Sequence, residues 1–265
     1  MYSLDERNPF RNWNVINICY ASGDFHVGNG EFAYTDAAGE KKILYHHGFR
    51  NFQMVMEEVK KYMPQNPEQL LIFGESAGGF AAAALAGEIA EMFPTCKDVT
   101  CLVDGAMIIA EMRDVIKDIW KAPEQFYLPV TSDNVTVDWL AGHYKKYGDK
   151  MRYLFISSTR DAVLTYFQAA FEGNQLGHTK EGGIKYQQDM KVMCERLQRE
   201  VPGIGICIYD FPANGLPAET ELTKHTILVE DLVFNKIRTD NVSPLEWIVD
   251  AMNGNVKSYG LELLK

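Results

Sequence analysis

Short apolar runs alternate with longer stretches of helical periodicity along most of the chain. This alternation predicts an α/β fold with a mostly parallel sheet flanked by helices. We expect strands over residues 15–20, 70–73, 99–103, 153–157 and 204–209, and amphipathic helices over residues 52–62, 77–92, 162–171 and 186–200. Parallel strands joined by right-handed crossovers bring their carboxyl ends to one edge of the sheet, where the functional residues of such folds gather.

The pattern predicts a single domain over residues 1–265, because neither a low-complexity linker nor an internal repeat interrupts it. Residues 111–150 form a long connection that carries several aromatic residues and is interrupted by Pro123 and Pro129. We interpret this segment as a cap inserted over the carboxyl edge of the sheet. The alternative is a helical excursion that packs on the sheet.

Composition narrows the class of protein. No apolar run approaches the ~20 residues that a membrane-spanning helix needs, and the first residues lack the apolar core of a signal peptide. The chain as written is therefore expected to be cytoplasmic, or secreted if an amino-terminal segment has been removed. A formal net charge of −10 argues against nucleic acid or an anionic membrane surface as partner, and more weakly against a highly charged polyuronate as substrate.

The cysteines indicate neither a metal site nor a disulfide framework. Their number, five, is odd, and no two of them have Cys-x-x-Cys spacing. We expect buried free thiols.

A Gly-x-Ser-x-Gly sequence, residues 74–78, lies between an apolar run and an alanine-rich stretch. A strand, a sharp turn and a helix in this order are what a nucleophile elbow requires. Glycine is favoured on both sides of the serine because the tight turn leaves no room for side chains. We therefore predict that Ser76 is a nucleophile held above the sheet edge. The N–H of Ala77, at the start of the following helix, is the first oxyanion donor that we expect.

A serine nucleophile needs a base, and the base needs an orienting carboxylate. Asp161 directly follows the apolar run around residues 153–157, and His225 lies after the last expected strand, before a helical run expected over 227–234. The order Ser76, Asp161, His225 is that of α/β-hydrolases. The predicted fold is thus α/β-hydrolase-like.

Other residues compete for these roles. Asp104 follows the strand at 99–103 and is an alternative acid, whereas Asp210 is interpreted as a turn or helix-capping residue. His143 and His178 are expected at the surface. The adjacent pair at 46–47 points to opposite sides of an extended chain, so chelation of a metal by both is not expected, and we predict neither metal nor cofactor.

Five blocks of the sequence, in order, resemble motifs of the pectin acetylesterase and Notum family. The blocks are Cys19-Tyr20-Ala21-Ser22-Gly23-Asp24-Phe25-His26-Val27-Gly28, residues 74–79, Asp104-Gly105-Ala106, residues 157–163, and His225 with Ser243-Pro244-Leu245-Glu246-Trp247. In the first block the order of cysteine and tyrosine is reversed relative to the family, and an alanine precedes the Ser-Gly-Asp core. The resemblance extends from about residue 8 to about residue 256.

This resemblance implies a serine esterase that removes short acyl groups, typically acetyl groups of plant polysaccharides, with a lipid-deacylating animal branch. It implies Ser76 as nucleophile, His225 as general base and acid, Asp161 as its orienting carboxylate and Ala77 N–H as an oxyanion donor. An acetylated carbohydrate is then the expected substrate, and no cofactor is needed. Asp24 and His26 match the family block but not the triad, and are expected to shape the cleft or support the structure.

The chain departs from the family at one point. Family members carry an upstream strand that ends in Gly-Gly-Gly-Ala-Cys-Trp and supplies further oxyanion donors, and residues 1–14 contain no such glycine run. Either the fold has a shortened amino terminus or another loop supplies the donor, with Gly23 and residues 28–30 as candidates. A catalytically impaired or non-catalytic hydrolase-fold protein is therefore the alternative function.

Overall fold

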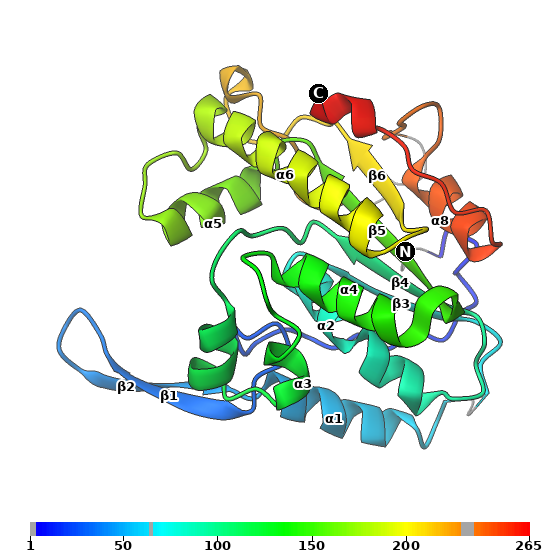
Figure 1. Ribbon diagram of the computed structural model, residues 1–265, viewed down its shortest axis with the longest axis horizontal. Coiled ribbons are helices and arrows are strands. Elements are labelled where there is room, and N and C mark those ends of the chain that lie inside the picture. Colours follow the sequence, from blue (N-terminus) through cyan, green and yellow to red (C-terminus); the bar gives the residue numbers. More distant parts are fainter. Residues whose placement is uncertain (1–3, 64–65, 229–235) are drawn as a thin grey trace.

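The computed structural model of the protein describes residues 4–63, 66–228 and 236–265 (Figure 1). Four parallel strands in the order β3-β4-β5-β6 form its central sheet. Their bounds are β3 Leu70–Glu75, β4 Val99–Asp104, β5 Met151–Ser158 and β6 Gly205–Tyr209. The predicted α/β fold with a parallel sheet flanked by helices is thus confirmed, and these four strands cover the runs at 70–73, 99–103, 153–157 and 204–209.

Each strand carries side chains to two separate cores. In β4, Cys101 and Val103 point to one core, and Leu102 between them points to the other. Every residue of β4 and β6 is buried. A sheet covered on both faces explains why these strands are continuous apolar runs in the sequence rather than alternating ones.

Helices cover the two faces unequally. The bounds of the larger helices are α1 Gly48–Val59, α2 Ala77–Met92, α4 Val135–Tyr147, α5 Ala162–Glu172, α6 Lys180–Glu200 and α8 Pro244–Met252. Helix α2 contacts α4, α4 contacts α6, and the three helices lie along one face of the sheet. Helix α8 packs on β5 and β6 from the other side (Figure 1). None of the described helices combines the length and the apolar character that crossing a bilayer would require.

The first expected strand is absent, and this prediction is wrong. Residues 14–20 pair with no strand, although the segment contributes Ile16 and Ile18 to the margin of the larger core. Val15 is 52% exposed. A short apolar run can therefore bury alternate side chains without the ladder of backbone hydrogen bonds that defines a strand.

Helix α6 begins six residues earlier than predicted. The Thr179 hydroxyl caps it by accepting the N–H of Gly182 at 3.1 Å. A Cβ on Gly182 would lie 2.1 Å from the Leu176 carbonyl oxygen, and one on Gly183 would lie 2.8 Å from Leu222 Cδ2. The two glycines therefore permit close packing inside the helix instead of preceding it.

Two elements were not anticipated. An antiparallel hairpin, β1 Gly30–Thr35 and β2 Lys41–His46, extends from the body of the molecule at the left of Figure 1. The other is helix α8, which begins with a capping box: Ser243 Oγ accepts the N–H of Glu246, and the Glu246 side chain accepts the N–H of Ser243. Part of the helix expected over 227–234 falls outside the described residues.

The connection at 111–150 forms the short helical turns Val115–Ile119 and α3 Glu124–Tyr127, then α4, and then the turn Gly148–Lys150. Trp139 of α4 is buried, and its indole N–H donates to the Phe126 carbonyl at 2.8 Å. Because α4 contacts α2 and α6, this part of the connection packs against the helical layer, and the cap over the site edge stays a prediction.

All five cysteines are free thiols. Four are buried as expected, namely Cys96, Cys101, Cys194 and Cys207. Cys19 is exposed instead, because it lies in the unpaired segment before the first hairpin.

Candidate active site

Ser76 lies between the last residue of β3 and the first residue of α2, with φ 55° and ψ −122°. Few residues other than glycine adopt this conformation, and it is the strained turn that a nucleophile elbow requires. A Cβ on Gly74 would lie 2.0 Å from the Gly78 carbonyl oxygen, and one on Gly79 would lie 2.7 Å from the Asp104 carbonyl oxygen. Contact between backbones therefore requires glycine at 74 and 79, whereas a Cβ on Gly78 would meet nothing within 4 Å.

Asp161 and His225 meet at the same edge. Asp161 Oδ2 accepts a hydrogen bond from His225 Nδ1 at 2.7 Å, and its Oδ1 accepts the N–H groups of Val163 and Leu164 at 3.0 and 2.9 Å. The Asp161 side chain is fully buried as the N-cap of α5. Since the carboxylate occupies Nδ1–H, the neutral histidine presents Nε2 as an acceptor.

The chain that carries His225 is tied to the loop that carries Asp161. Thr223 N–H donates to the Arg160 carbonyl, and Ala162 N–H donates to the Thr223 carbonyl, both at 3.0 Å. The Thr223 hydroxyl accepts the Arg160 N–H at 2.9 Å. These bonds hold the two residues at a fixed separation although they are 64 positions apart in the sequence.

The backbone at residues 104–105 links Ser76 to His225. Ser76 N–H donates to the Asp104 carbonyl at 2.8 Å, and a Cβ on Gly105 would lie 3.4 Å from His225 Cε1. Across the described ranges no hydrogen bond joins the Ser76 and His225 side chains, and His225 Nε2 is buried without a partner. Catalytic hydrogen bonds are commonly long in the absence of substrate.

Asp104, the alternative acid, binds a different part of the same chain. Its Oδ2 accepts the N–H groups of Ile227 and Leu228 at 3.0 and 3.3 Å. Burial, followed by the negative charges of Glu75 and Asp161, raises the pKa of the Asp104 carboxyl well above its usual range. Asp104 therefore anchors the segment that follows His225, while Asp161 contacts the imidazole.

The remaining candidates lie apart from this cluster. Asp210 is exposed and accepts the Thr159 hydroxyl at 3.3 Å. His178 is exposed, as expected. His143 is half-buried rather than fully exposed: its Nε2 lies 3.2 Å from the Ala84 carbonyl of α2, and burial lowers the pKa of His143.

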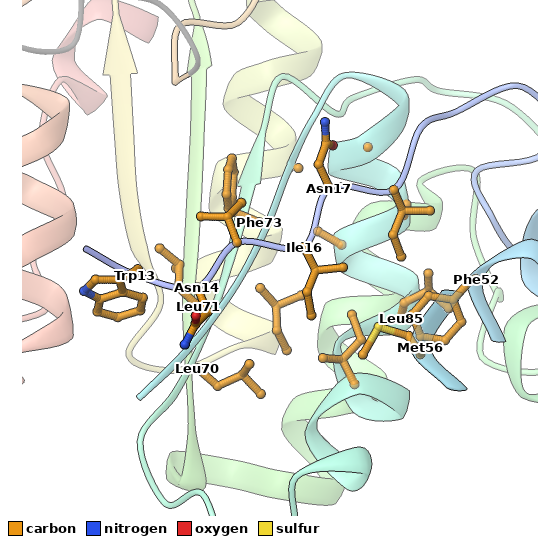
Figure 2. A pocket seen from close by; sticks show the side chains of 18 of the residues that line it. Trp13, Asn14, Ile16, Asn17, Phe52, Met56, Leu70, Leu71, Phe73 and Leu85 are labelled. Atoms are coloured by element: carbon orange, nitrogen blue, oxygen red, sulfur yellow. The ribbon is translucent and has the colours of Figure 1, made fainter. Parts of the chain in front are cut away.

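A cavity of about 920 Å³ adjoins the elbow. Figure 2 shows Trp13, Asn14, Ile16 and Asn17 of the unpaired segment along one side of it, with Leu70, Leu71 and Phe73 of β3 on another. Ser76, Ala77 and Gly78 also line it, as do Tyr20 and His26 from the loop over residues 20–28, hereafter the 20–28 loop.

The 20–28 loop is organised around a buried carboxylate. Asp24 is fully buried, and its oxygens accept the Ser22 hydroxyl at 2.5 Å, the His26 N–H at 3.1 Å and the Gly48 N–H at 2.8 Å. A Cβ on Gly28 would lie 2.3 Å from Asp24 Oδ2. The spacing Asp24-x-His26-x-Gly28 thus follows from packing around Asp24.

Of the glycines considered as oxyanion donors, Gly23 and Gly28 lie in the 20–28 loop, and Gly30 is the first residue of β1. Asn29 N–H donates to the Trp120 carbonyl at 2.9 Å, and Gly30 pairs with His46 in the first register position of β1 and β2. Gly23 lies in the 20–28 loop with φ 64°.

Comparisons with known proteins agree with the motifs. A pectinacetylesterase family model matches residues 3–134. Pectin acetylesterase 7 of Arabidopsis thaliana is 28% identical over 103 residues, which are 38% of this chain and 25% of that protein. The family match includes the 20–28 loop and Ser76, whereas Asp161 and His225 lie beyond its end.

We expect Gly105→Ala to lower the free energy of unfolding by more than Gly173→Ala does. Both glycines have positive φ, 59° and 66°, so each alanine carries a strain of about 1–2 kcal/mol. Only at Gly105 would the new methyl also meet neighbours, at 2.8 Å from Thr226 Cγ2 and close to the His225 ring, whereas nothing lies within 4 Å at Gly173. Urea unfolding of both variants measures the difference, and equal losses would contradict the packing of His225 on Gly105.

The free energy of unfolding of Asp104→Asn should increase relative to that of wild type as the pH rises. The folded chain keeps the Asp104 proton to a higher pH than the unfolded chain, so this group's contribution to the free energy of unfolding falls as the pH rises from the usual carboxyl range through the raised pKa. Asparagine carries no charge and keeps an oxygen for the two N–H groups.

The measurement is urea unfolding of Asp104→Asn and wild type at about pH 5 and about pH 8, with Asp210→Asn as the exposed control. The difference in free energy of unfolding between Asp104→Asn and wild type should shift in favour of the variant at the higher pH. A difference that stays constant between the two pH values would be incompatible with a raised pKa at Asp104.

Proposed function

Over residues 3–134 the chain belongs to the pectin acetylesterase family, and from this premise we propose that it is a serine esterase that removes O-acetyl groups from plant-type poly- or oligosaccharides. The observation that carries the proposal is the 2.7 Å hydrogen bond from His225 to the buried Asp161, at the sheet edge where Ser76 stands in a strained turn. A nucleophile, a base and an orienting acid are the minimum set for acyl transfer through an acyl-enzyme.

In the first step, Ser76 Oγ attacks the carbonyl carbon of the acetyl ester while His225 Nε2 takes the hydroxyl proton. Asp161 stabilises the imidazolium that results and keeps the ring in the orientation in which Nε2 is free. The tetrahedral intermediate collapses when His225 returns the proton to the sugar oxygen, so the sugar leaves as an alcohol. Water then attacks the acetyl-enzyme with His225 again as base, and acetate is released.

The oxyanion of the intermediate faces the start of a helix. Ala77 is the first residue of α2, which has 16 residues, so its N–H has no acceptor four residues earlier within the helix. The partial positive charge at a helix amino terminus adds to that donor. Ser76 and Ala77 both line the cavity, so the proposed oxyanion position is reachable from it. This chemistry uses no cofactor.

A second function, a catalytically impaired or non-catalytic hydrolase-fold protein, is favoured by one observation. Within the described residues no hydrogen bond joins the Ser76 and His225 side chains, and His225 Nε2 is buried without a partner. The two functions differ in whether Ser76 reacts.

Wild-type protein should react with a fluorophosphonate probe and hydrolyse 4-nitrophenyl acetate, and Ser76→Ala should do neither while keeping its fold. The reason is that both reactions need the activated serine hydroxyl. Mass spectrometry of the labelled peptide identifies the modified residue. A folded wild type that neither labels nor turns over would favour the non-catalytic alternative, and labelling elsewhere would exclude Ser76 as nucleophile.

Asp161→Asn should lower kcat on the order of 10⁴-fold, because the amide no longer holds the imidazole in the reactive tautomer. Asp104→Asn should retain most of the wild-type kcat, since an asparagine oxygen can still accept the N–H groups of Ile227 and Leu228. Steady-state kinetics of the two variants on one ester tests the assignment. The opposite ranking would make Asp104 the catalytic acid.

A further inference from the structure

The first turn of α2 holds the 20–28 loop beside Ser76. The Phe25 ring stacks on the Phe80 ring with centroids 4.3 Å apart and planes 12° from parallel. Phe80 is one helical turn after Ser76, and its N–H donates to the Ser76 carbonyl at 3.1 Å. The residue after Phe25 therefore lies close to the elbow in space, although 50 positions separate His26 from Ser76 in the sequence.

The backbone of the 20–28 loop is strained at this point. Phe25 and His26 have φ of 50° and 60°, a region that residues other than glycine seldom adopt. Such conformations persist only where the surroundings enforce them, and they gather at functional sites. Here the buried Asp24 enforces them by accepting the N–H groups of His26 and Gly48.

Packing leaves His26 little freedom to turn away. A Cβ on Gly48 would lie 2.6 Å from His26 Cα, so the start of α1 is in direct contact with the backbone of the loop. The His26 ring lies 5.0 Å from the Tyr20 ring, and only 6% of the residue is exposed. His26 nevertheless lines the cavity that Ser76 and Ala77 line.

The His26 ring can donate a hydrogen bond there. Its two nitrogens bind no other group in the part of the chain that the structure describes, where the backbone N–H is the only His26 atom with a hydrogen bond. Burial lowers the pKa of His26, which keeps the imidazole neutral with one N–H donor near neutral pH. Histidine side chains are among the groups that serve as oxyanion donors in enzymes.

We propose that His26 is a further catalytic residue of this esterase, whose ring N–H binds the ester carbonyl oxygen as that oxygen becomes negative. The role rests on the proposed esterase function and supplies the second donor beside Ala77 N–H. It differs from the glycine-rich backbone donors that the family resemblance implies. The Asn29 N–H cannot take the role, because it donates to the Trp120 carbonyl at the base of the hairpin.

The test compares wild type, His26→Ala and His26→Gln, with His178→Ala as a control at an exposed histidine of the same chain. Turnover of 4-nitrophenyl acetate gives kcat and KM. A trifluoromethyl ketone forms a tetrahedral adduct with a serine hydroxyl, and the adduct carries a negative oxygen. Inhibition by this ketone therefore measures how tightly the enzyme binds a mimic of the tetrahedral intermediate. Thermal unfolding checks that each variant is folded.

For His26→Ala we expect kcat to fall about 10²–10³-fold with KM changed less than about threefold, and the affinity for the ketone to fall by a similar factor as kcat. His26→Gln, which keeps an N–H donor, should recover part of the loss, and His178→Ala should match wild type. A purely structural role would instead lower thermal stability without making the two losses parallel.

If wild type turns over and folded His26→Ala keeps its kcat and its affinity for the ketone, the role of His26 is overturned and the esterase stands. A wild type that neither turns over nor labels with fluorophosphonate overturns the esterase and this role together. Should His26→Ala not fold, the ¹H–¹⁵N resonances of the wild-type histidine rings decide. A downfield shift of the His26 N–H on adduct formation supports the role, and an unchanged resonance overturns it.

Discussion

The register of the parallel strands is the constraint on which the site depends. Glu75 of β3 pairs with Asp104 of β4, and Asp104 pairs with Ile156 of β5. The three strands therefore end close to one line, and the loops after them carry Ser76, Gly105 and Asp161 to the same edge. The contact of Gly74 with the Gly78 carbonyl and of Gly79 with the Asp104 carbonyl fixes how sharply the chain turns at that line. A shift of β3 along β4 would separate Ser76 from the backbone against which His225 packs.

Two buried carboxylates share this edge, and their surroundings separate their roles. Asp161 receives three hydrogen bonds, one of them from His225, whereas Asp104 receives two from the backbone and has an oxygen, Oδ1, that is buried without a partner within the described part of the chain. A charged carboxylate is stabilised by each donor that it binds, and two nearby negative charges oppose each other. The better-supplied group is thus suited to face an imidazolium, whereas the other, whose pKa is raised by burial, holds the backbone that follows His225.

Much of this arrangement could be predicted from local sequence, and the misses share a cause. Strands buried on both faces are continuous apolar runs, and glycines flank Ser76 in the sequence. The positions of β3 to β6, α2 and Ser76 could therefore be predicted from the sequence. The segment at 15–20 is a short apolar run like those of the four strands, but pairing depends on a neighbouring strand that an apolar run does not encode. The glycines at 182–183 look like a helix boundary in the sequence. They lie inside α6 because the helix packs closely against Leu176 and Leu222, and such tertiary contacts cannot be predicted from local sequence. The hydrogen bond from His225 to Asp161 likewise joins residues 64 apart, so sequence order could indicate the pair but not its geometry.

The family match and the hydrogen-bond geometry bear on different halves of the same site. The match ends at residue 134, so it covers the serine and the 20–28 loop, and it is independent of the contact between Asp161 and His225. The contact between Asp161 and His225, in turn, lies outside the residues that the family model matches. The two halves meet at residues 104–105, where the Ser76 N–H donates to the Asp104 carbonyl and Gly105 packs on the His225 ring. The short connection after β4 contains no residue of the expected triad, yet a change of its backbone shape would move the proposed nucleophile relative to the proposed base.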